Sequence, residues 1–319
     1  LKMTLVSWFD EVECENLCDV VGGKGASLCA LFQNQFPVVE GFMVCADAFR
    51  EFMSFNSLWE DVFRALDSID WVDNSSLAET GEYLRKIIME AAMPDELVKL
   101  IARYYSELGA DVPVAVRSSG TAEDLDDASF AGQQETFLFV IGEEDLIRYV
   151  KACWASLYND SAIFYRREKG FDEREIAIAV VVQKMVNSEK SGVLFTANPI
   201  TNDLSVVMIE ATWGLGEGLV QGLVNPDNYL IQKETGIFDF RYVPEKDLMV
   251  VRKDESGGVE TVDVPEALVS APVLTDEECR ELVELAVLTE EFYQKPQDIE
   301  WAYEGNKLYL LQSRPITTL

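Results

Sequence analysis

The stretch Asp298-Ile-Glu-Trp-Ala-Tyr-Glu-Gly-Asn-Lys-Leu-Tyr-Leu-Leu-Gln-Ser-Arg-Pro315 predicts a β-hairpin near the end of the chain. Two apolar strands flank a turn at Glu304-Gly-Asn306, a residue combination typical of hairpin connections. A three-residue loop centred on Asn306 would place Glu300 directly opposite Gln312 on the returning strand. Asp298 lies two residues before Glu300 and therefore points to the same face.

This face of the hairpin has the chemistry of a metal and phosphate site. A carboxylate and an amide carbonyl, side by side, are oxygen ligands that suit Mg²⁺ bound together with nucleotide phosphates. Arg314, next on the same face, could neutralise phosphate charge. The alternative is a solvated strand face, because polar residues at alternate positions are common in half-buried sheets. Gln312 lies among Leu308, Leu310 and Leu311. An amide side chain without a binding partner would gain nothing at such an apolar position, so we favour the interpretation that this face binds Mg²⁺ and ATP.

The composition indicates an acidic protein large enough for two domains. The chain has 319 residues, 48% of them hydrophobic, and a formal net charge of −31. A surface this acidic repels nucleic acid and anionic membranes, so we expect neither as a partner. No apolar run reaches about 18 residues and the N-terminus is unlike a secretion signal, so we expect a soluble, cytoplasmic protein.

The chain contains no histidine. This excludes a Ser-His-Asp triad and any phosphohistidine formed within these residues. The chemistry of the chain must therefore use lysine, arginine, carboxylates, hydroxyl groups and backbone amides.

The order of the predicted elements favours an α+β fold in two lobes over a doubly wound α/β fold. The motif Thr275-Asp-Glu-Glu278 predicts a capping box at the start of a helix that runs to about Tyr293. The exit of an apolar strand at Gln183 to Val186 is a plausible hinge, so we expect an N-terminal lobe over residues 1–186 and a C-terminal lobe over 187–319. Other helical patterns fall at 46–55, 76–91, 94–108 and 143–169.

The segment Gly22-Gly-Lys-Gly25 precedes a predicted helix from Ala26 to about Phe32. It is not a Walker A loop, because that motif needs a glycine at position 18 and Ser or Thr at position 25. Glycines, a lysine and a helix N-terminus still suit phosphate. Taken alone, the segment favours a tight turn with a surface Lys24 over a phosphate-binding loop.

Two further segments have a possible phosphate-binding role. Arg117 ends a buried strand beside small residues, where its guanidinium could fork onto phosphate, although an ion pair with Glu123 or Asp124 fits as well. The run Gly132-Gln-Gln-Glu-Thr136 could cover a triphosphate, although an ordinary hairpin turn also fits.

The segment Gln183-Lys-Met-Val186 could bind an adenine edge. An extended backbone offers a donor and an acceptor, and Met185 would form a soft apolar wall. A plain strand end is the simpler alternative. The glycine-rich run Trp213-Gly-Leu-Gly-Glu-Gly218 fails the dinucleotide fingerprint, because Leu219 stands where the third glycine should be.

Taken together, the motifs resemble the N-terminal ATP-binding domain of the phosphoenolpyruvate synthase, pyruvate phosphate dikinase and rifampicin phosphotransferase family. The resemblance covers essentially the whole chain and implies an ATP-grasp-like fold, with ATP held between two α+β lobes. The motifs that carry it, in chain order, are Gly-Gly-Lys-Gly-Ala-Ser-Leu (22–28), Val-Arg-Ser-Ser-Gly-Thr-Ala-Glu-Asp-Leu (116–125), Ala-Ser-Phe-Ala-Gly-Gln-Gln-Glu-Thr (128–136), Ser-Gly-Val-Leu-Phe-Thr (191–196), Asp-Ile-Glu-Trp-Ala (298–302) and Leu-Gln-Ser-Arg-Pro (311–315).

The resemblance implies a role for each matching residue. Phosphate contacts would come from Lys24, Arg117, Gly132 and Thr136. Adenine would be held by Gln183, Lys184, Met185 and Val186. Mg²⁺, together with ribose or phosphate, would be bound by Asp298, Glu300 and Gln312, and Arg314 would support the transfer.

The family's reaction implies pyrophosphoryl transfer from ATP to a histidine on a swivelling domain, with release of AMP. After hydrolysis or attack by phosphate removes the outer phosphoryl group, the remaining phosphoryl group would reach an acceptor such as pyruvate or an antibiotic hydroxyl on a third domain. Both partner domains would belong to a longer polypeptide or to a separate subunit. Two rival functions are an ATP-grasp carboxylate-amine ligase, which makes ADP, and a non-catalytic nucleotide-sensing module.

Overall fold

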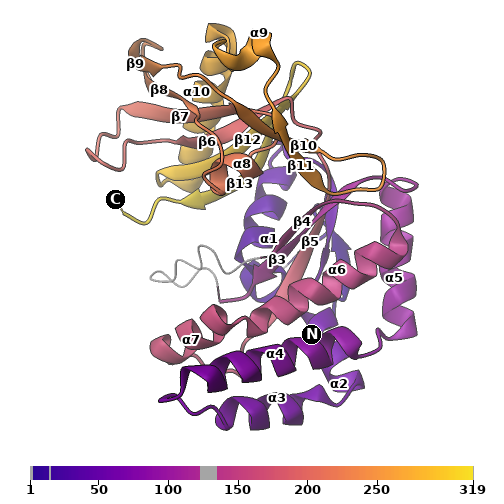
Figure 1. Ribbon diagram of the computed structural model, residues 1–319. Helices are drawn as coiled ribbons and strands as arrows, with labels where there is room; N and C mark the ends of the chain where they lie inside the picture. Colours follow the sequence, from indigo (N-terminus) through magenta and orange to yellow (C-terminus); the bar gives the residue numbers. More distant parts are fainter. Residues whose placement is uncertain (1–2, 14–15, 123–134, 319) are drawn as a thin grey trace. The chain divides into compact units, whose positions relative to one another are not determined.

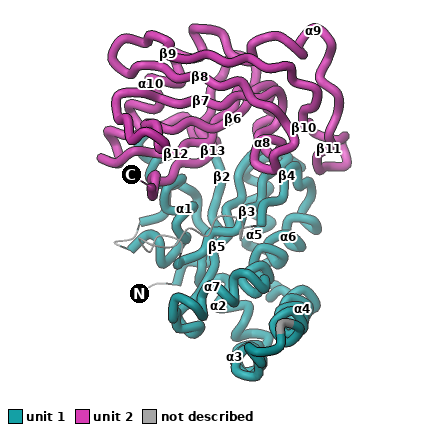
Figure 2. Tube along the Cα trace, turned by 60° about the vertical axis from the view of Figure 1, so that its left-hand side comes forward, with its two compact units in different colours: residues 1–34, 40–185 teal, residues 35–39, 186–319 magenta. Residues whose placement is uncertain are grey.

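The computed structural model (Figure 1) describes residues 3–13, 16–122 and 135–318, which divide into two compact units. Unit 1 comprises residues 1–34 and 40–185, and unit 2 comprises residues 35–39 and 186–319 (Figure 2). Each unit combines helices with antiparallel strands. The mixed α+β class predicted from the sequence is therefore confirmed.

The described part of unit 1 is built on a five-stranded sheet in which all neighbouring strands run antiparallel. In spatial order its strands are β1 (Val6–Trp8), β2 (Gly41–Val44), β5 (Ile178–Lys184), β3 (Val114–Gly120) and β4 (Thr136–Val140). Its helices are α1 (Leu17–Gln33), α2 (Ala46–Phe55), α3 (Leu58–Asp67), α4 (Asn74–Glu90), α5 (Asp95–Leu108), α6 (Glu143–Ala155), the short 3-10 turn η1 (Ser156–Tyr158) and α7 (Asp160–Lys169).

The central strand β5 is buried on both faces, which explains why its sequence is a continuous apolar run. Val180 and Val182 point into a hydrophobic core that also contains residues of α2, α5 and α6. Ala179 and Val181 are equally buried but point to the opposite face, against which α1 packs. Figure 1 shows α1 on the other side of the sheet from α6.

The described part of unit 2 is built on a six-stranded antiparallel sheet and a separate hairpin, β10 (Leu248–Arg252) and β11 (Val259–Asp263). In spatial order the strands of the sheet are β13 (Lys307–Pro315), β12 (Gln297–Glu304), β6 (Lys190–Phe195), β7 (Val206–Trp213), β8 (Asp227–Gln232) and β9 (Phe238–Tyr242). The helices are α8 (Glu217–Val220), α9 (Glu266–Val269) and α10 (Asp276–Tyr293). The segment 35–39 joins this unit through a hydrogen bond from the amide of Leu310 to the carbonyl of Pro37, at 2.9 Å.

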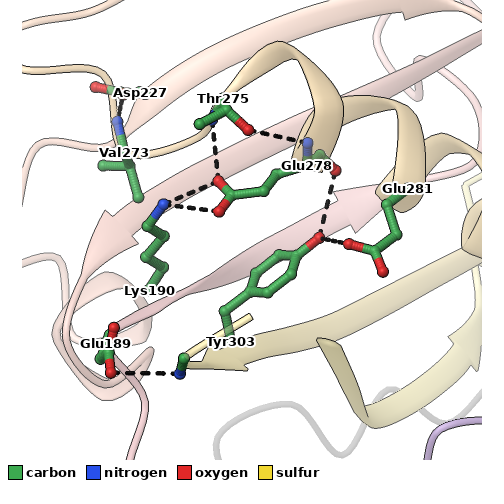
Figure 3. A network of polar contacts seen from close by, with 9 residues as sticks. Glu189, Lys190, Asp227, Val273, Thr275, Glu278, Glu281 and Tyr303 are labelled. Carbon is green, nitrogen blue, oxygen red and sulfur yellow. Dashed lines mark hydrogen bonds and ion pairs between the residues drawn. The ribbon is translucent and has the colours of Figure 1, made fainter. Parts of the chain in front are cut away.

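Helix α10 is fixed to one face of this sheet by a polar network (Figure 3). The predicted capping box is confirmed: the Thr275 hydroxyl accepts from the amide of Glu278 at 3.2 Å, and the Glu278 carboxylate accepts from the amide of Thr275 at 2.9 Å. Lys190 on β6 forms an ion pair with Glu278 at 2.8 Å. The Tyr303 hydroxyl on β12 donates to Glu281 at 2.5 Å. Because side chains alternate along a strand, even-numbered residues of β12 point to the opposite face.

No helix within the described ranges is both long and apolar enough to cross a membrane.

Candidate functional site

The hairpin of β12 and β13 brings Glu300 opposite Gln312. This pairing was predicted, but the three-residue loop used to predict it was wrong. The loop is the two-residue turn Gly305-Asn306, and Leu311 forms a bulge in β13 that shifts the pairing by one residue before Gln312. The short turn and the bulge compensate for each other, so the carboxylate and the amide still lie side by side.

The same row of the sheet contains Glu210, which the sequence analysis did not single out. Glu300 pairs with Val193 on β6, and Val193 pairs with Glu210 on β7. Paired residues on neighbouring strands point to the same face. Burial raises the pKa of the Glu210 carboxyl, and the negative charge of Asp298 raises it further. The signal in the sequence was a single charged residue within the apolar strand β7.

Asp298 holds Arg314 on this face. The Arg314 Nε atom lies 2.8 Å from Asp298 Oδ2, and the two residues are paired across the hairpin. Burial raises the pKa of the Asp298 carboxyl; the Arg314 guanidinium opposes that shift, and Glu300 adds to it. The Arg314 side chain is 57% exposed, so its guanidinium can contact a further anion while remaining anchored.

The oxygen atoms of this face fit a Mg²⁺ ion that a nucleotide helps to bind. Within the described ranges, no three or more acidic or cysteine side chains gather closely enough to hold a metal ion by themselves. Mg²⁺ is usually bound by one or two carboxylates plus substrate phosphates and water. The half-buried side chains of Glu300 and Gln312 supply ligands of the right kind, but too few to bind the ion without phosphate.

In unit 1, the predicted phosphate contacts Lys24, Arg117 and Thr136 share one face of the sheet with Gln183 of the predicted adenine segment. Arg117 on β3 pairs with Thr136 on β4 and, on its other side, with Val181 on β5. Gln183 lies two residues after Val181 and therefore points to the same face. Lys24, on α1, packs over this face, since α1 contacts both β3 and β5. Thr136 is exposed, whereas Lys24 and Arg117 are each only 8% exposed.

The position of Lys24 follows from a break in α1. Gly22 has φ 70° and ψ 172°, which interrupts the helix. A Cβ atom on Gly22 would lie 2.2 Å from the carbonyl oxygen of Ser119, so only glycine fits. Two residues later, Lys24 Nζ donates to the carbonyl of Ser118 at 3.3 Å. The sequence predicted a turn before a helix at Gly22–Gly25; the structure places the turn inside the helix.

Two of the four amides in the segment predicted to hold adenine donate to backbone carbonyls. The amide of Lys184 donates to the carbonyl of Glu40 at 3.2 Å, and the amide of Met185 donates to the carbonyl of Pro113 at 2.9 Å. The Lys184 ammonium also forms an ion pair with the Glu40 carboxylate. An adenine edge would therefore need the amide of Val186 as its donor.

Two predictions concern residues outside the described ranges. Gly132, a predicted phosphate contact, is one of them. The alternative ion pair of Arg117 with Glu123 or Asp124 also involves residues outside those ranges.

The fold and these residues define a class: a two-unit α+β protein with cationic side chains on one sheet and a row of carboxylate and amide oxygen atoms on another. Comparison with known families identifies the group more closely. The family model described as "Pyruvate phosphate dikinase, AMP/ATP-binding domain" matches residues 18–319. The chain belongs to this family and is a dikinase-type ATP-binding domain.

Curated relatives carry names from the same family. The chain is 45% identical to the probable phosphoenolpyruvate synthase of Methanocaldococcus jannaschii, covering 100% of this chain and 27% of the relative. It is 43% identical to the phosphoenolpyruvate synthase of Pyrococcus furiosus, covering 98% and 44%. It is 40% identical to the rifampicin phosphotransferase of Bacillus cereus, covering 98% and 36%. The chain thus spans less than half the length of each of these relatives.

Likeness to solved structures is low. The D-alanine–D-alanine ligase of Bacillus anthracis is 13% identical with a TM-score of 0.24, covering 72% of this chain and 57% of the ligase chain. A score at this level supports no conclusion about fold or activity.

Proposed function

We propose that this chain binds Mg-ATP and donates the pyrophosphoryl group of ATP to a histidine of another domain. The observation that carries the proposal is the pairing of Glu300 with Gln312 on the face of the unit 2 sheet opposite α10, in a chain that belongs to a dikinase ATP-binding family. The histidine must come from elsewhere, because this chain contains none.

In this proposal Glu300 and Gln312 hold Mg²⁺, which when bound neutralises phosphate charge and orients the triphosphate. Arg314, anchored by Asp298, contributes a cation to the same phosphates. Lys24, Arg117 and Thr136 contact the triphosphate from unit 1, with Gly132 as a further contact, and catalysis consists of positioning and charge stabilisation.

Adenine would be held by the strand exit of Gln183, Lys184, Met185 and Val186. The support is that the amides of Lys184 and Met185 already donate to backbone carbonyls, which leaves the amide of Val186 as a donor to the adenine edge. Asp298 would serve the ribose or phosphate side, in addition to its ion pair with Arg314.

The proposed chemical step balances without a covalent intermediate on this chain. An imidazole nitrogen attacks the β-phosphorus, the bond between that phosphorus and the bridging oxygen of AMP breaks, and AMP leaves with the oxygen. The pyrophosphoryl group is then on the histidine of the swivelling domain. Water or inorganic phosphate takes its outer phosphoryl group, which leaves as phosphate or pyrophosphate, and the phosphoryl group that stays on the histidine passes to an acceptor such as pyruvate or an antibiotic hydroxyl. The greater length of the relatives supports additional domains in the same polypeptide.

The test is product analysis with labelled ATP, using the chain alone and the chain mixed with the histidine-bearing region of a relative. We expect Mg-ATP binding in both samples and AMP only in the mixture, together with label on histidine. ADP formation would instead indicate a ligase. Binding without AMP in any mixture would indicate a nucleotide sensor, and absence of ATP binding would refute the proposal.

A further inference from the structure

The hydroxyl group of Ser119 replaces a backbone hydrogen bond that is missing from α1. In a regular α-helix the amide of Gly25 would donate to the carbonyl of Val21, four residues earlier. At the break the Ser119 hydroxyl lies between these two groups: it accepts from the Gly25 amide at 2.9 Å and donates to the Val21 carbonyl at 2.7 Å. Ser119 has no exposed surface, so water cannot take over these bonds.

This insertion fixes the backbone on both sides of Lys24. The bonds to Val21 and Gly25 enclose the segment that contains Gly22 and Lys24, and the close approach of Gly22 to Ser119 leaves no room for a side chain. A side chain inserted into the hydrogen-bond ladder is a recognised cause of helix kinks. The break in α1 is therefore held open from β3, almost a hundred residues away in sequence.

Strand β3, which carries Ser119, also carries the second cationic side chain, Arg117. Ser119 lies two residues after Arg117 on β3, so the two side chains point to the same face. The strand that bears Arg117 thus also sets the conformation of the backbone that bears Lys24. No motif in the sequence connects the two cations in this way.

We propose that Ser119 is a positioning residue for phosphate binding: its hydroxyl keeps α1 open at Gly22 and so holds Lys24 in place relative to Arg117. This rests on the proposed function, because it assumes that Lys24 contacts the triphosphate. Without the hydroxyl, the amide of Gly25 and the carbonyl of Val21 are both buried without a partner, and the open segment of α1 that carries Lys24 is no longer held in place.

The first test compares ATP with adenosine in calorimetric titrations of Ser119→Ala. We expect about a tenfold loss of Mg-ATP affinity, the size of one charge-assisted contact, and adenosine affinity within about twofold of the wild type, because adenosine has no phosphate. The matched control is Ser156→Ala, a buried serine whose hydroxyl donates to the carbonyl of Cys153 at 2.6 Å. The control removes a comparable hydrogen bond and should leave both affinities unchanged. Wild-type Mg-ATP affinity in Ser119→Ala would overturn the proposal.

The second test is a double-mutant cycle with Lys24→Ala. If Ser119 acts through Lys24, the additional change Ser119→Ala should weaken Mg-ATP binding by less than about twofold in a chain that already lacks Lys24. A purely structural role for Ser119 would give the same loss in both backgrounds, and that result would overturn the proposal. Should Ser119→Ala not fold, Ser119→Cys, a weak hydrogen-bonding side chain of similar size, takes its place with the same expectations.

The third test separates this proposal from the proposed function, because it needs no nucleotide. Amide hydrogen exchange of Gly25 should be slow in the wild type and about tenfold faster or more in Ser119→Ala. Faster exchange in a chain that never binds ATP would retain the positioning role and refute the nucleotide function. Unchanged exchange would overturn the positioning role, whatever the chain binds.

Discussion

The two sheets differ in how their charged side chains are held. On unit 1, Lys24 and Arg117 are almost fully buried, and Lys24 already has a protein acceptor in the carbonyl of Ser118. On unit 2, Glu300 and Gln312 are only half buried, and the nearby Asp298 and Glu210 carboxyls have raised pKa values because burial disfavours their charge.

The difference concerns what the protein supplies and what the ligand must supply. The cations of unit 1 are positioned in advance by hydrogen bonds and by the shape of α1. The oxygen atoms of unit 2 are a surplus of negative charge that a divalent ion would relieve. We therefore expect substitutions on unit 2 to act through the metal and substitutions on unit 1 to act through the phosphates.

The largest effect is expected at the hairpin of unit 2. Glu300→Ala or Gln312→Ala should weaken Mg-ATP binding by about 100-fold, because each removes one of the few protein ligands of the ion. Isothermal titration calorimetry measures this directly. Glu284→Ala, which removes an exposed glutamate from α10, is the charge-matched control and should bind as the wild type does. Equal affinity in all these variants would remove the metal site from the account.

A smaller effect is expected on unit 1. Arg117→Lys keeps the charge but loses the planar fork that matches phosphate, so Mg-ATP affinity should fall by about tenfold while adenosine binding stays constant. Arg148→Lys on α6, where the arginine is exposed, is the control. A parallel loss of ATP and adenosine affinity in Arg117→Lys would show that the side chain supports the fold rather than the phosphates.

The capping box of α10 tests whether the face behind the hairpin can be weakened separately. Thr275→Ala should lower the free energy of unfolding by about 1 kcal/mol, the usual value of such a cap, with Mg-ATP affinity unchanged. Thr201→Ala, at an exposed position of the same unit, should change stability by less than about 0.5 kcal/mol. A stability of Thr275→Ala equal to that of Thr201→Ala would show that the capping box does not stabilise α10.

The smallest effect is expected from Glu210→Gln. A carboxyl with a raised native pKa binds more protons in the folded than in the unfolded state, so it lowers stability as the pH rises through its titration range. The substitution should therefore raise the melting temperature at pH 7 without Mg²⁺. The gain should vanish at acid pH, where the protonated Glu210 carboxyl and the amide that replaces it are both neutral. Thermal denaturation across this pH range measures it, and a gain that grows toward acid pH would contradict the assigned sign.

Local patterns in the sequence were sufficient for several elements. The capping box at Thr275 contains its own hydrogen-bonding partners, so the start of α10 could be predicted from the local sequence. The α+β class followed from the order of the elements. The opposition of Glu300 and Gln312 was also found, although the bulge at Leu311 could not be foreseen, because apolar residues on both sides of it give no sign of which one is extra.

Other features depend on contacts that are distant in sequence. The break in α1 is held by Ser119 on β3, and no local pattern around Gly22 contains that information. Glu210 lies in the same row as Glu300 and Gln312 because β7 lies beside β6, and the local sequence does not reveal that strand order. The predicted helix over 143–169 is interrupted at Asn159, and the short helix α3 lies between predicted ones. The roles assigned to individual site residues stay predictions.

The most direct test of the account is the dependence of ATP affinity on magnesium in the wild type and in Glu300→Ala. Both proteins are titrated with ATP in excess Mg²⁺ and again in excess EDTA. The account predicts that Mg²⁺ strengthens ATP binding to the wild type and that this gain is largely lost in Glu300→Ala, with similar affinities of both proteins in EDTA. An undiminished magnesium gain in Glu300→Ala would contradict the claim that the paired strands of unit 2 bind the metal with the nucleotide.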